Sequence, residues 1–222
     1  LLKVRKDTIV VMIAGSPIDM SEWVDQASTL VYSSFIGMEG GFALAQVLCG
    51  QINPSGKLPI TMPKCLEDSP AHKLGEFPGG DRVDYKEGIY VGYRYFDTFG
   101  CKPLFAFGYG LSYTDFMLTD LLVKTDANQI PAAKVMVKIE NTGKVSGYET
   151  VQIYVHSESK TVERANKELK AFQKLFLQPG ESKILEFDLN LEDFSYYSET
   201  EQCFVTEAGS YTILVGNSSN HC

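Results

Sequence analysis

The sequence lacks the features that would assign it to a membrane, a metal ion or a nucleic acid. No apolar run approaches the roughly 18 residues that cross a bilayer, and the short apolar run 9–14 leads into a turn rather than a signal-peptide cleavage site. The five cysteines are an odd number without a CxxC pair, so neither a disulfide framework nor a zinc site is indicated. The 20 basic residues are outnumbered by 28 acidic ones and do not cluster, which argues against a phosphate-backbone partner.

Familiar catalytic and cofactor signatures are missing as well. Gly15-Ser16-Pro17 and Gly110-Leu111-Ser112 lack the second glycine of a nucleophile elbow. Gly79-Gly80 lacks the Lys-Ser/Thr pair of a phosphate-binding loop. His72 and His156 are isolated, and we expect both to be surface residues without a metal. We therefore expect no cofactor, no metal, no nucleic acid and no membrane among the partners of this chain.

What is present suits a globular protein of one or two domains. The chain has 222 residues, of which 44% are hydrophobic and 22% charged, enough for each domain to bury a core of its own. It has no initiator methionine and starts almost inside a predicted strand. We therefore expect it to be a piece of a longer protein.

The first half alternates strands with helices. Residues 8–13 form a continuous apolar run typical of a parallel strand covered on both faces, and residues 29–32 predict the next strand. Ser21 is the predicted N-cap of a short helix. Residues 39–48 predict a helix that is largely buried, with Gly50 as its left-handed C-cap. This order predicts an α/β layer.

The α/β half ends in less regular sequence. Residues 57–61 predict a short strand, and residues 64–86, rich in Gly, Pro and polar side chains, predict a long surface loop of the kind that often carries function. Residues 87–116 interleave aromatic residues with glycines and suit a seam between two packed domains. Within that seam we expect Arg94 to form a partly buried ion pair with Glu87 or Asp97.

The second half predicts an antiparallel β-sandwich. Short runs alternate apolar and polar residues with a period of two, and turn signals such as Asn141-Thr142-Gly143 and Pro179-Gly180-Glu181 separate them. About seven strands fit this pattern, as a sandwich requires. The predicted strands are 116–124, 135–139, 151–155, 168–177, 185–189, 202–206 and 211–215.

Several stretches together resemble the C-terminal half of a glycoside hydrolase family 3 β-glucosidase. They are GMEGGFALAQVLCGQINPSGKLPITMP, GEFPG, YKEGIYVGYRYFD and PLFAFGYGLSYTDF, which occur in the family's order. KELKAF followed by LQPGES resembles the fibronectin type III-like domain of the same family. The resemblance implies part of an α/β sandwich domain over 1–63, a loop and interdomain seam over 64–115, and a fibronectin type III-like domain over 116–222.

The resemblance also implies a retaining hydrolase of terminal non-reducing β-D-glucosyl residues in oligosaccharides or aryl glucosides. Retaining hydrolysis needs two carboxyl groups about 5–5.5 Å apart. In this family the nucleophilic Asp lies on a barrel domain, and the acid/base Glu lies upstream of the strand that opens this chain. Neither motif has a match here. We expect no catalytic residue in this segment, an inactive isolated chain, and a barrel supplied by the rest of the chain or by a second chain.

Loop and helix residues remain as candidates for other roles. If the barrel packs beside the α/β domain, Phe77 and Tyr85 in the 64–86 loop would form a stacking platform at the rim of the sugar pocket. Glu39 is better explained by the helix dipole than by a cleft.

Other functions stay open at this point. β-Xylosidases and α-arabinosidases share these domains. A function from another class is a non-catalytic module whose sandwich binds carbohydrate or protein through a row of exposed aromatics. Phe194 and Tyr196 share a side of the chain whereas Tyr197 opposes them, so a flat platform is not clearly encoded.

The expected location is the bacterial cytoplasm rather than the outside of a cell. Short loops, the acidic pI of about 4.9 and unpaired cysteines favour it. The sequon Asn217-Ser218-Ser219 would matter only in a protein secreted by a eukaryotic cell.

Overall fold

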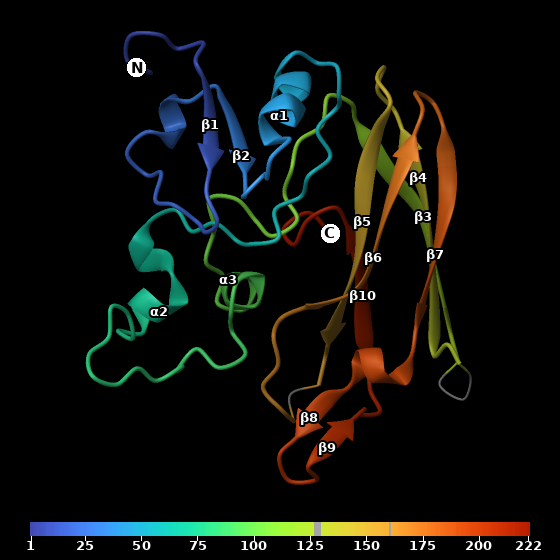
Figure 1. Ribbon diagram of the computed structural model, residues 1–222. Helices are drawn as coiled ribbons and strands as arrows, with labels where there is room; N and C mark the ends of the chain where they lie inside the picture. Colours follow the sequence, from blue (N-terminus) through green and yellow to red (C-terminus); the bar gives the residue numbers. More distant parts are fainter. Residues whose placement is uncertain (127–129, 160) are drawn as a thin grey trace. The chain divides into compact units, whose positions relative to one another are not determined.

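The computed structural model describes residues 1–126, 130–159 and 161–222, and the chain forms two compact units (Figure 1). The N-terminal unit comprises Leu1–Ile52 and Leu58–Phe107, and the sandwich unit comprises Asn53–Lys57 and Gly108–Cys222. The chain therefore changes from one unit to the other after residues 52, 57 and 107. Each unit is described below by itself.

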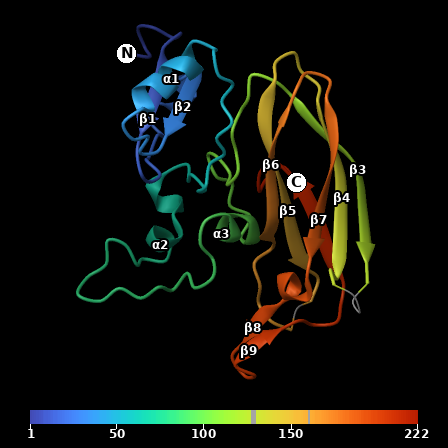
Figure 2. The same cartoon turned by 45° about the vertical axis from the view of Figure 1, so that its right-hand side comes forward.

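The N-terminal unit contains a parallel pair of strands and one longer helix. Strand β1 (Ile9–Ile13) pairs with β2 (Thr29–Ser33) in parallel, with Ile9 opposite Thr29. Helix α1 (Gly40–Leu48) lies beside the two strands in both views (Figure 2). Gly50 has φ +71°, as its predicted C-cap role requires. Both predicted strands and the predicted helix are present.

The expected burial of these elements is wrong. Ile9 and Ile13 at the ends of β1 are exposed, only Gly40 of α1 is buried, and Phe42 on this helix is 66% exposed. A parallel pair of strands normally needs covering layers on both faces. The described residues of this unit supply two paired strands and one helix of that length, so much of their apolar surface stays open.

Two other local predictions are also wrong. The helix expected after Ser21 is only the 3-10 turn η1 (Val24–Gln26), because the Ser21 hydroxyl and N–H both donate to Asp19 Oδ1, at 2.6 and 2.9 Å. Residues 57–61 are not a strand, since the nearest sheet-like pairing is a single bridge between Met62 and Phe105. The proline that follows Met62 cannot donate the next ladder hydrogen bond.

Short helices interrupt the remainder of the unit. They are η2 (Leu66–Asp68), α2 (Pro70–Lys73) and α3 (Tyr93–Thr98). Tyr95 and Phe96 of α3 are buried in an aromatic cluster. The predicted ion pair of Arg94 with Glu87 or Asp97 stays a prediction.

The sandwich unit contains two three-stranded antiparallel sheets. One has the order β3 (Phe116–Thr125), β4 (Ala133–Asn141), β7 (Ser182–Leu189), and the other β10 (Tyr211–Gly216), β5 (Gly147–Ser157), β6 (Glu168–Leu177). A hairpin of β8 (Tyr196–Ser198) and β9 (Cys203–Val205) follows the 3-10 turn η3 (Leu191–Phe194). The predicted antiparallel sandwich is confirmed. All seven predicted strand regions are strands, and β8 is an additional strand that the sequence did not predict.

The period-two pattern explains the core between the two sheets. Every second residue of β4, such as Val135, Val137 and Ile139, is buried, and Val151 and Ile153 of β5 lie in the same cluster. Large apolar residues on alternate positions thus close a continuous core. The 202–206 strand lies outside both sheets, because β9 pairs only with β8.

The aromatic and histidine residues singled out from the sequence lie in different surroundings. Phe194 is buried in η3, and exposed Tyr197 packs edge-on against Phe204 at 5.5 Å between ring centroids. The expectation that His72 is exposed is wrong, whereas His156 lies at the surface as expected, with its side chain 31% exposed. His72 packs on Phe77 at 4.7 Å, and half-buried His156 contacts the Asn166 carbonyl oxygen.

Two findings bear on the wider setting of the chain. None of the five cysteines, all of which the structure describes, forms a disulfide, and Cys49, Cys203 and Cys222 are exposed. None of the helices within the described ranges has the length and apolarity needed to span a bilayer.

Candidate functional site

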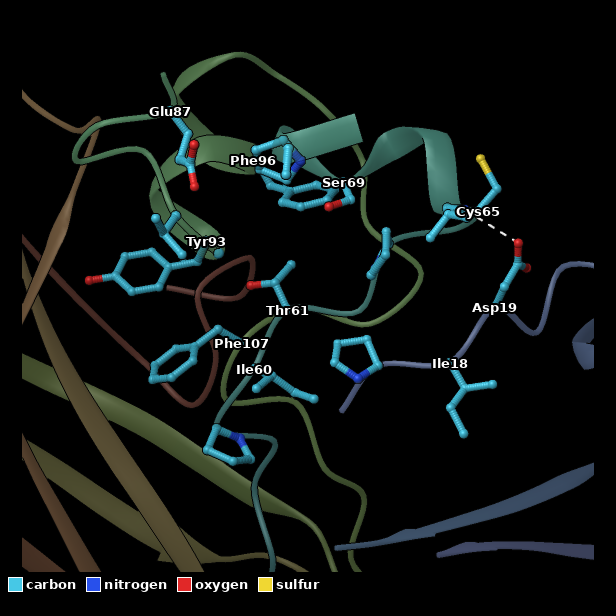
Figure 3. Close-up of a pocket in the computed structure, with 18 residues that line it drawn as sticks. Ile18, Asp19, Ile60, Thr61, Cys65, Ser69, Glu87, Tyr93, Phe96 and Phe107 are labelled. Atoms are coloured by element: carbon cyan, nitrogen blue, oxygen red, sulfur yellow. Dashed lines mark hydrogen bonds between the residues drawn. The ribbon is translucent and has the colours of Figure 1, made fainter. Parts of the chain in front are cut away.

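The N-terminal unit holds a cavity of about 580 Å³, within the usual size range of small-molecule sites (Figure 3). Its walls are mainly apolar, with few polar side chains. The lining residues are Pro17, Ile18, Asp19, Pro59, Ile60, Thr61, Pro63, Cys65, Leu66, Ser69, Pro70, Ala71, Glu87, Val91, Gly92, Tyr93, Phe96 and Phe107.

The bridge between Met62 and Phe105 brings together two stretches of the chain that line this cavity. Met62 N–H donates to the Phe105 carbonyl oxygen and Leu104 N–H donates to the Met62 carbonyl oxygen, both at 2.8 Å. One wall therefore comes from residues 59–63 and another from Phe107. The Phe107 ring packs against Tyr93 with centroids 5.0 Å apart and planes at 33°.

Helix α3 is positioned by the glycine that precedes it. Gly92 has φ +58°, a conformation that side chains other than glycine rarely adopt, and it is the residue immediately before the helix. The turn lets Tyr93 and Phe96 of the first helical turn contribute to the cavity wall.

Thr61 is the polar residue of this cavity whose hydrogen bonding is incomplete. It is 8% exposed, and its Oγ1 is buried without a hydrogen-bond partner in the described structure. Figure 3 shows it among the lining side chains. A buried hydroxyl of this kind costs stability unless a partner reaches it. Thr61 is therefore the one residue of the cavity that calls for a ligand or a further part of the protein.

Asp19 and Glu87 are the acidic residues of the lining. Asp19 Oδ2 also accepts a hydrogen bond from Leu66 N–H at 3.3 Å, marked in Figure 3. The hydrogen bonds from the Ser21 hydroxyl and N–H lower the pKa of Asp19 below its ordinary value. Asp19 is thus an ionised group that fixes local backbone, and its proton is not available near neutral pH.

The 64–86 loop is closed by a buried carboxylate. Glu76 forms an ion pair with Lys86 and accepts a hydrogen bond from Asp84 N–H at 3.0 Å. Lys86 is the main reason that the pKa of Glu76 lies below its ordinary value, with the Asp84 N–H adding to it. Phe77 and Tyr85 lie inside this closed stretch and are 57% and 83% exposed. The structure does not place either of them in the cavity lining.

The cavity was not found from the sequence because its walls come from distant stretches. Residues 17–19, 59–71 and 87–107 meet only through tertiary packing. The clustering of Pro59, Pro63 and Pro70 is a signal for rigid turns, not for a site. In the described part of the chain, no group of three or more His, Cys, Asp or Glu residues could hold a metal ion.

The chain thus joins a small unit that has a parallel pair of strands to a unit that is an antiparallel sandwich. Residues 1–93 match the glycosyl hydrolase family 3 C-terminal domain, and residues 149–219 match the fibronectin type III-like domain. The chain belongs to glycoside hydrolase family 3 and corresponds to the C-terminal part of its members.

Similar proteins carry names within that family. The chain is 45% identical over 98% of its length to thermostable beta-glucosidase B of Acetivibrio thermocellus, and 43% identical over 97% to an exo-alpha-(1->6)-L-arabinopyranosidase of Bifidobacterium breve. It superposes on a crystal structure of a Bifidobacterium adolescentis GH3 beta-glucosidase with a TM-score of 0.93 and 39% identity, covering 99% of this chain and 32% of that one. It spans only 29% and 28% of the length of the two curated relatives.

Proposed function

We propose that this chain is part of a retaining β-glucosidase that hydrolyses terminal non-reducing β-D-glucosyl residues of oligosaccharides or aryl glucosides. The observation that carries the proposal is the 45% identity, over 98% of the chain, to a protein named as a beta-glucosidase. Both catalytic carboxylates are assigned to sequence outside residues 1–222. The barrel that bears the nucleophile is assigned to the remainder of the same polypeptide or to a second chain.

Two samples test this proposal. The full-length gene product that contains this chain is assayed on nitrophenyl β-D-glucoside, next to the isolated 222-residue chain at the same molar concentration. We expect hydrolysis by the full-length protein and none by the isolated chain. Hydrolysis by the isolated chain, or its absence with the folded full-length protein, would contradict the proposal.

Other glycosides of the same family are the second candidates. A relative with 43% identity carries the name exo-alpha-(1->6)-L-arabinopyranosidase, whereas the relative with 45% identity is named a beta-glucosidase. Similarity at this level therefore does not distinguish the two activities. Nitrophenyl β-D-xyloside, α-L-arabinofuranoside and α-L-arabinopyranoside therefore belong in the same assay. A kcat/KM higher for one of these than for the glucoside would replace β-glucosidase by that activity.

Phe77 and Tyr85 are proposed as a stacking platform at the rim of the sugar pocket. Their exposure on a loop closed by the Glu76–Lys86 ion pair supports this role, since both rings are accessible on an ordered segment. In the full-length protein, Phe77→Ala and Tyr85→Ala should raise KM for aryl glucosides and leave kcat nearly unchanged. Phe172→Ala, which removes an exposed ring of the sandwich unit, is the control. An unchanged KM would rule the platform out.

A non-catalytic binding module is the candidate from another class. Two contacting ring pairs of the sandwich are exposed, Tyr197–Phe204 with 78° between planes and Tyr148–Phe176 with 59°, and neither offers a flat surface for a sugar. We therefore propose that the sandwich has no glucan-binding role. Retention of the 222-residue chain on insoluble cellulose, lost in Tyr197→Ala, would overturn this.

Two further expectations are proposals of the same kind. We propose the domain limits 1–63, 64–115 and 116–222, which limited proteolysis followed by mass spectrometry can test. We also propose a bacterial cytoplasmic location, supported by the free cysteines and the acidic balance of charge. Recovery of the protein from the culture medium or periplasm would contradict that location.

A further inference from the structure

Segment Asn53–Lys57 belongs to the sandwich unit although it lies between two stretches of the N-terminal unit. Its first residue is held by three hydrogen bonds. Asn53 Nδ2 donates to the Ser146 carbonyl oxygen at 3.1 Å, and its Oδ1 accepts from the Ser112 hydroxyl at 3.0 Å and from Tyr113 N–H at 2.8 Å. The segment is thus fixed to two separate stretches of the sandwich unit.

The last residue of the segment is held by a buried ion pair. Lys57 Nζ lies 2.8 Å from Glu149 Oε1, and the two side chains are only 12% and 5% exposed. Lys57 Nζ also donates to the Gly110 carbonyl oxygen at 2.9 Å, and Glu149 Oε1 accepts from Thr150 N–H at 2.7 Å. Glu149 is on β5, so this charge is carried by a rigid element.

The backbone of the segment passes directly beside the chain that returns to the sandwich. A Cβ atom on Gly110 would clash with the Gly56 carbonyl oxygen, and only glycine avoids that clash. Residues 56–57 and residue 110 therefore meet at one place in the sandwich unit. The intervening 58–107 segment leaves the sandwich and returns to it at that place.

The 58–107 segment carries the proposed stacking platform and most of the cavity lining. It contains Phe77 and Tyr85, and all cavity-lining residues except Pro17, Ile18 and Asp19. Its two ends pair with each other immediately inside, through the Met62–Phe105 bridge. If Lys57 and Gly110 separate, the Met62–Phe105 bridge is therefore the first pairing along the chain that the separation would weaken.

We propose that Lys57 and Glu149 form a clasp that closes the base of the 58–107 segment, and that Glu149 is a positioning residue of the enzyme contributed by the fibronectin-like sandwich. The part that concerns catalysis rests on the proposed function. In this proposal the sandwich contributes to catalysis by fixing the ends of the 58–107 segment, and it does not bind the glucan itself.

Hydrogen exchange of the 222-residue chain tests the clasp without any activity. Glu149→Gln leaves the buried Lys57 ammonium without its charged partner. The control, Glu186→Gln, makes the same substitution in the exposed Lys134–Glu186 pair of the same unit, where Asp188 also pairs with Lys134. We expect exchange of the Met62 and Leu104 amides to accelerate on the order of 100-fold in Glu149→Gln. Glu186→Gln should leave both amides unchanged.

A second variant serves as the test if Glu149→Gln does not fold. If Glu149→Gln loses the exchange protection of the sandwich strands as well, Asn53→Ala gives the measurement instead. It weakens the same segment without stranding a charge, and it should accelerate the same two amides by a smaller factor. Wild-type exchange at Met62 and Leu104 in every variant that keeps a folded sandwich would overturn the clasp.

Kinetics of the full-length protein test the positioning role. Glu149→Gln should raise KM for aryl glucosides by roughly ten-fold with a smaller change in kcat. The single variant Lys57→Arg, which keeps Glu149 and therefore the charge pair, should keep KM close to the wild-type value. Faster exchange with unchanged KM and kcat would overturn the positioning role. If the wild-type protein hydrolyses no glucoside, the proposed function fails while the exchange result still decides the clasp.

Discussion

Replacing Thr61 by valine should stabilise the isolated chain. The Thr61 hydroxyl is buried against the cavity without a hydrogen-bond partner, and an unsatisfied buried polar group costs about 1–3 kcal/mol. Valine keeps the branched shape and puts a methyl group where the hydroxyl lies, so no cavity is created. The lower end of that range applies because the oxygen borders a space that a water molecule can enter transiently. We therefore expect the free energy of unfolding to rise by about 1 kcal/mol.

The assay is urea unfolding of the 222-residue chain followed by fluorescence. Trp23 is the single tryptophan and lies in the N-terminal unit together with Thr61. Thr61→Ser keeps the hydroxyl but loses a methyl group, and it should be less stable than wild type. Thr142→Val, which removes an exposed hydroxyl of the sandwich unit, should leave the Trp23 transition unchanged. A Thr61→Val midpoint at or below wild type, with an unchanged slope, would refute the reasoning.

The full-length protein extends the same prediction. If a group outside residues 1–222 bonds the Thr61 hydroxyl, valine removes a satisfied hydrogen bond and the sign of the effect reverses. Thr61→Val should then lower the free energy of unfolding of the full-length protein by about 1 kcal/mol. Opposite signs in the two samples would identify the cavity as a contact for the rest of the polypeptide.

Three further predictions concern the sandwich unit. Asn141→Ala should lower the free energy of unfolding in urea by about 3 kcal/mol. The fully buried Asn141 amide accepts a hydrogen bond from a threonine hydroxyl at 2.7 Å and donates to two carbonyl oxygens at 2.9 and 3.1 Å. A loss below about 1 kcal/mol would contradict this prediction. Leu177→Ala, at a fully buried core position, should cost about 2–5 kcal/mol by the same measurement, and a smaller loss would mean that the core collapses around the truncation. Partial burial by itself raises the pKa of Glu168, but Lys170 and Arg164 outweigh it and leave that pKa below the ordinary 4.5. The ionised form of Glu168 therefore stabilises the fold above pH 4.5. The difference in the free energy of unfolding between wild type and Glu168→Gln should decrease as the pH falls through the lowered pKa. A difference that stays constant from about pH 7 to pH 3 would disprove this.

The local elements followed from the sequence because their causes are local. Alternating apolar residues such as Val135 and Val137 predicted sandwich strands, since a period of two puts them on one face of a sheet. Gly50 predicted the end of α1, since it takes the left-handed conformation with little strain. The joint order of several motifs predicted the family. Each of these depends on residues close together in the chain.

Burial and the site were decided by tertiary structure. The apolar residues of α1 predicted a buried helix, yet the described unit has too few layers to cover it, and Phe42 is exposed. Thr61 and Phe107 lie far apart in the sequence yet line one cavity. Sequence spacing does not record such a site, because it forms only when distant stretches of the chain pack together.

The sequence by itself determined the class of the protein, the strands of the sandwich and the absence of recognisable catalytic motifs, because periodicity and motif order are properties of the chain. Only the tertiary structure decided that Lys57 pairs with Glu149, that Thr61 is left without a partner, and that residues 58–107 leave and rejoin the sandwich at one place. These features join residues far apart along the chain. Long-range packing creates such contacts, and no local pattern records them.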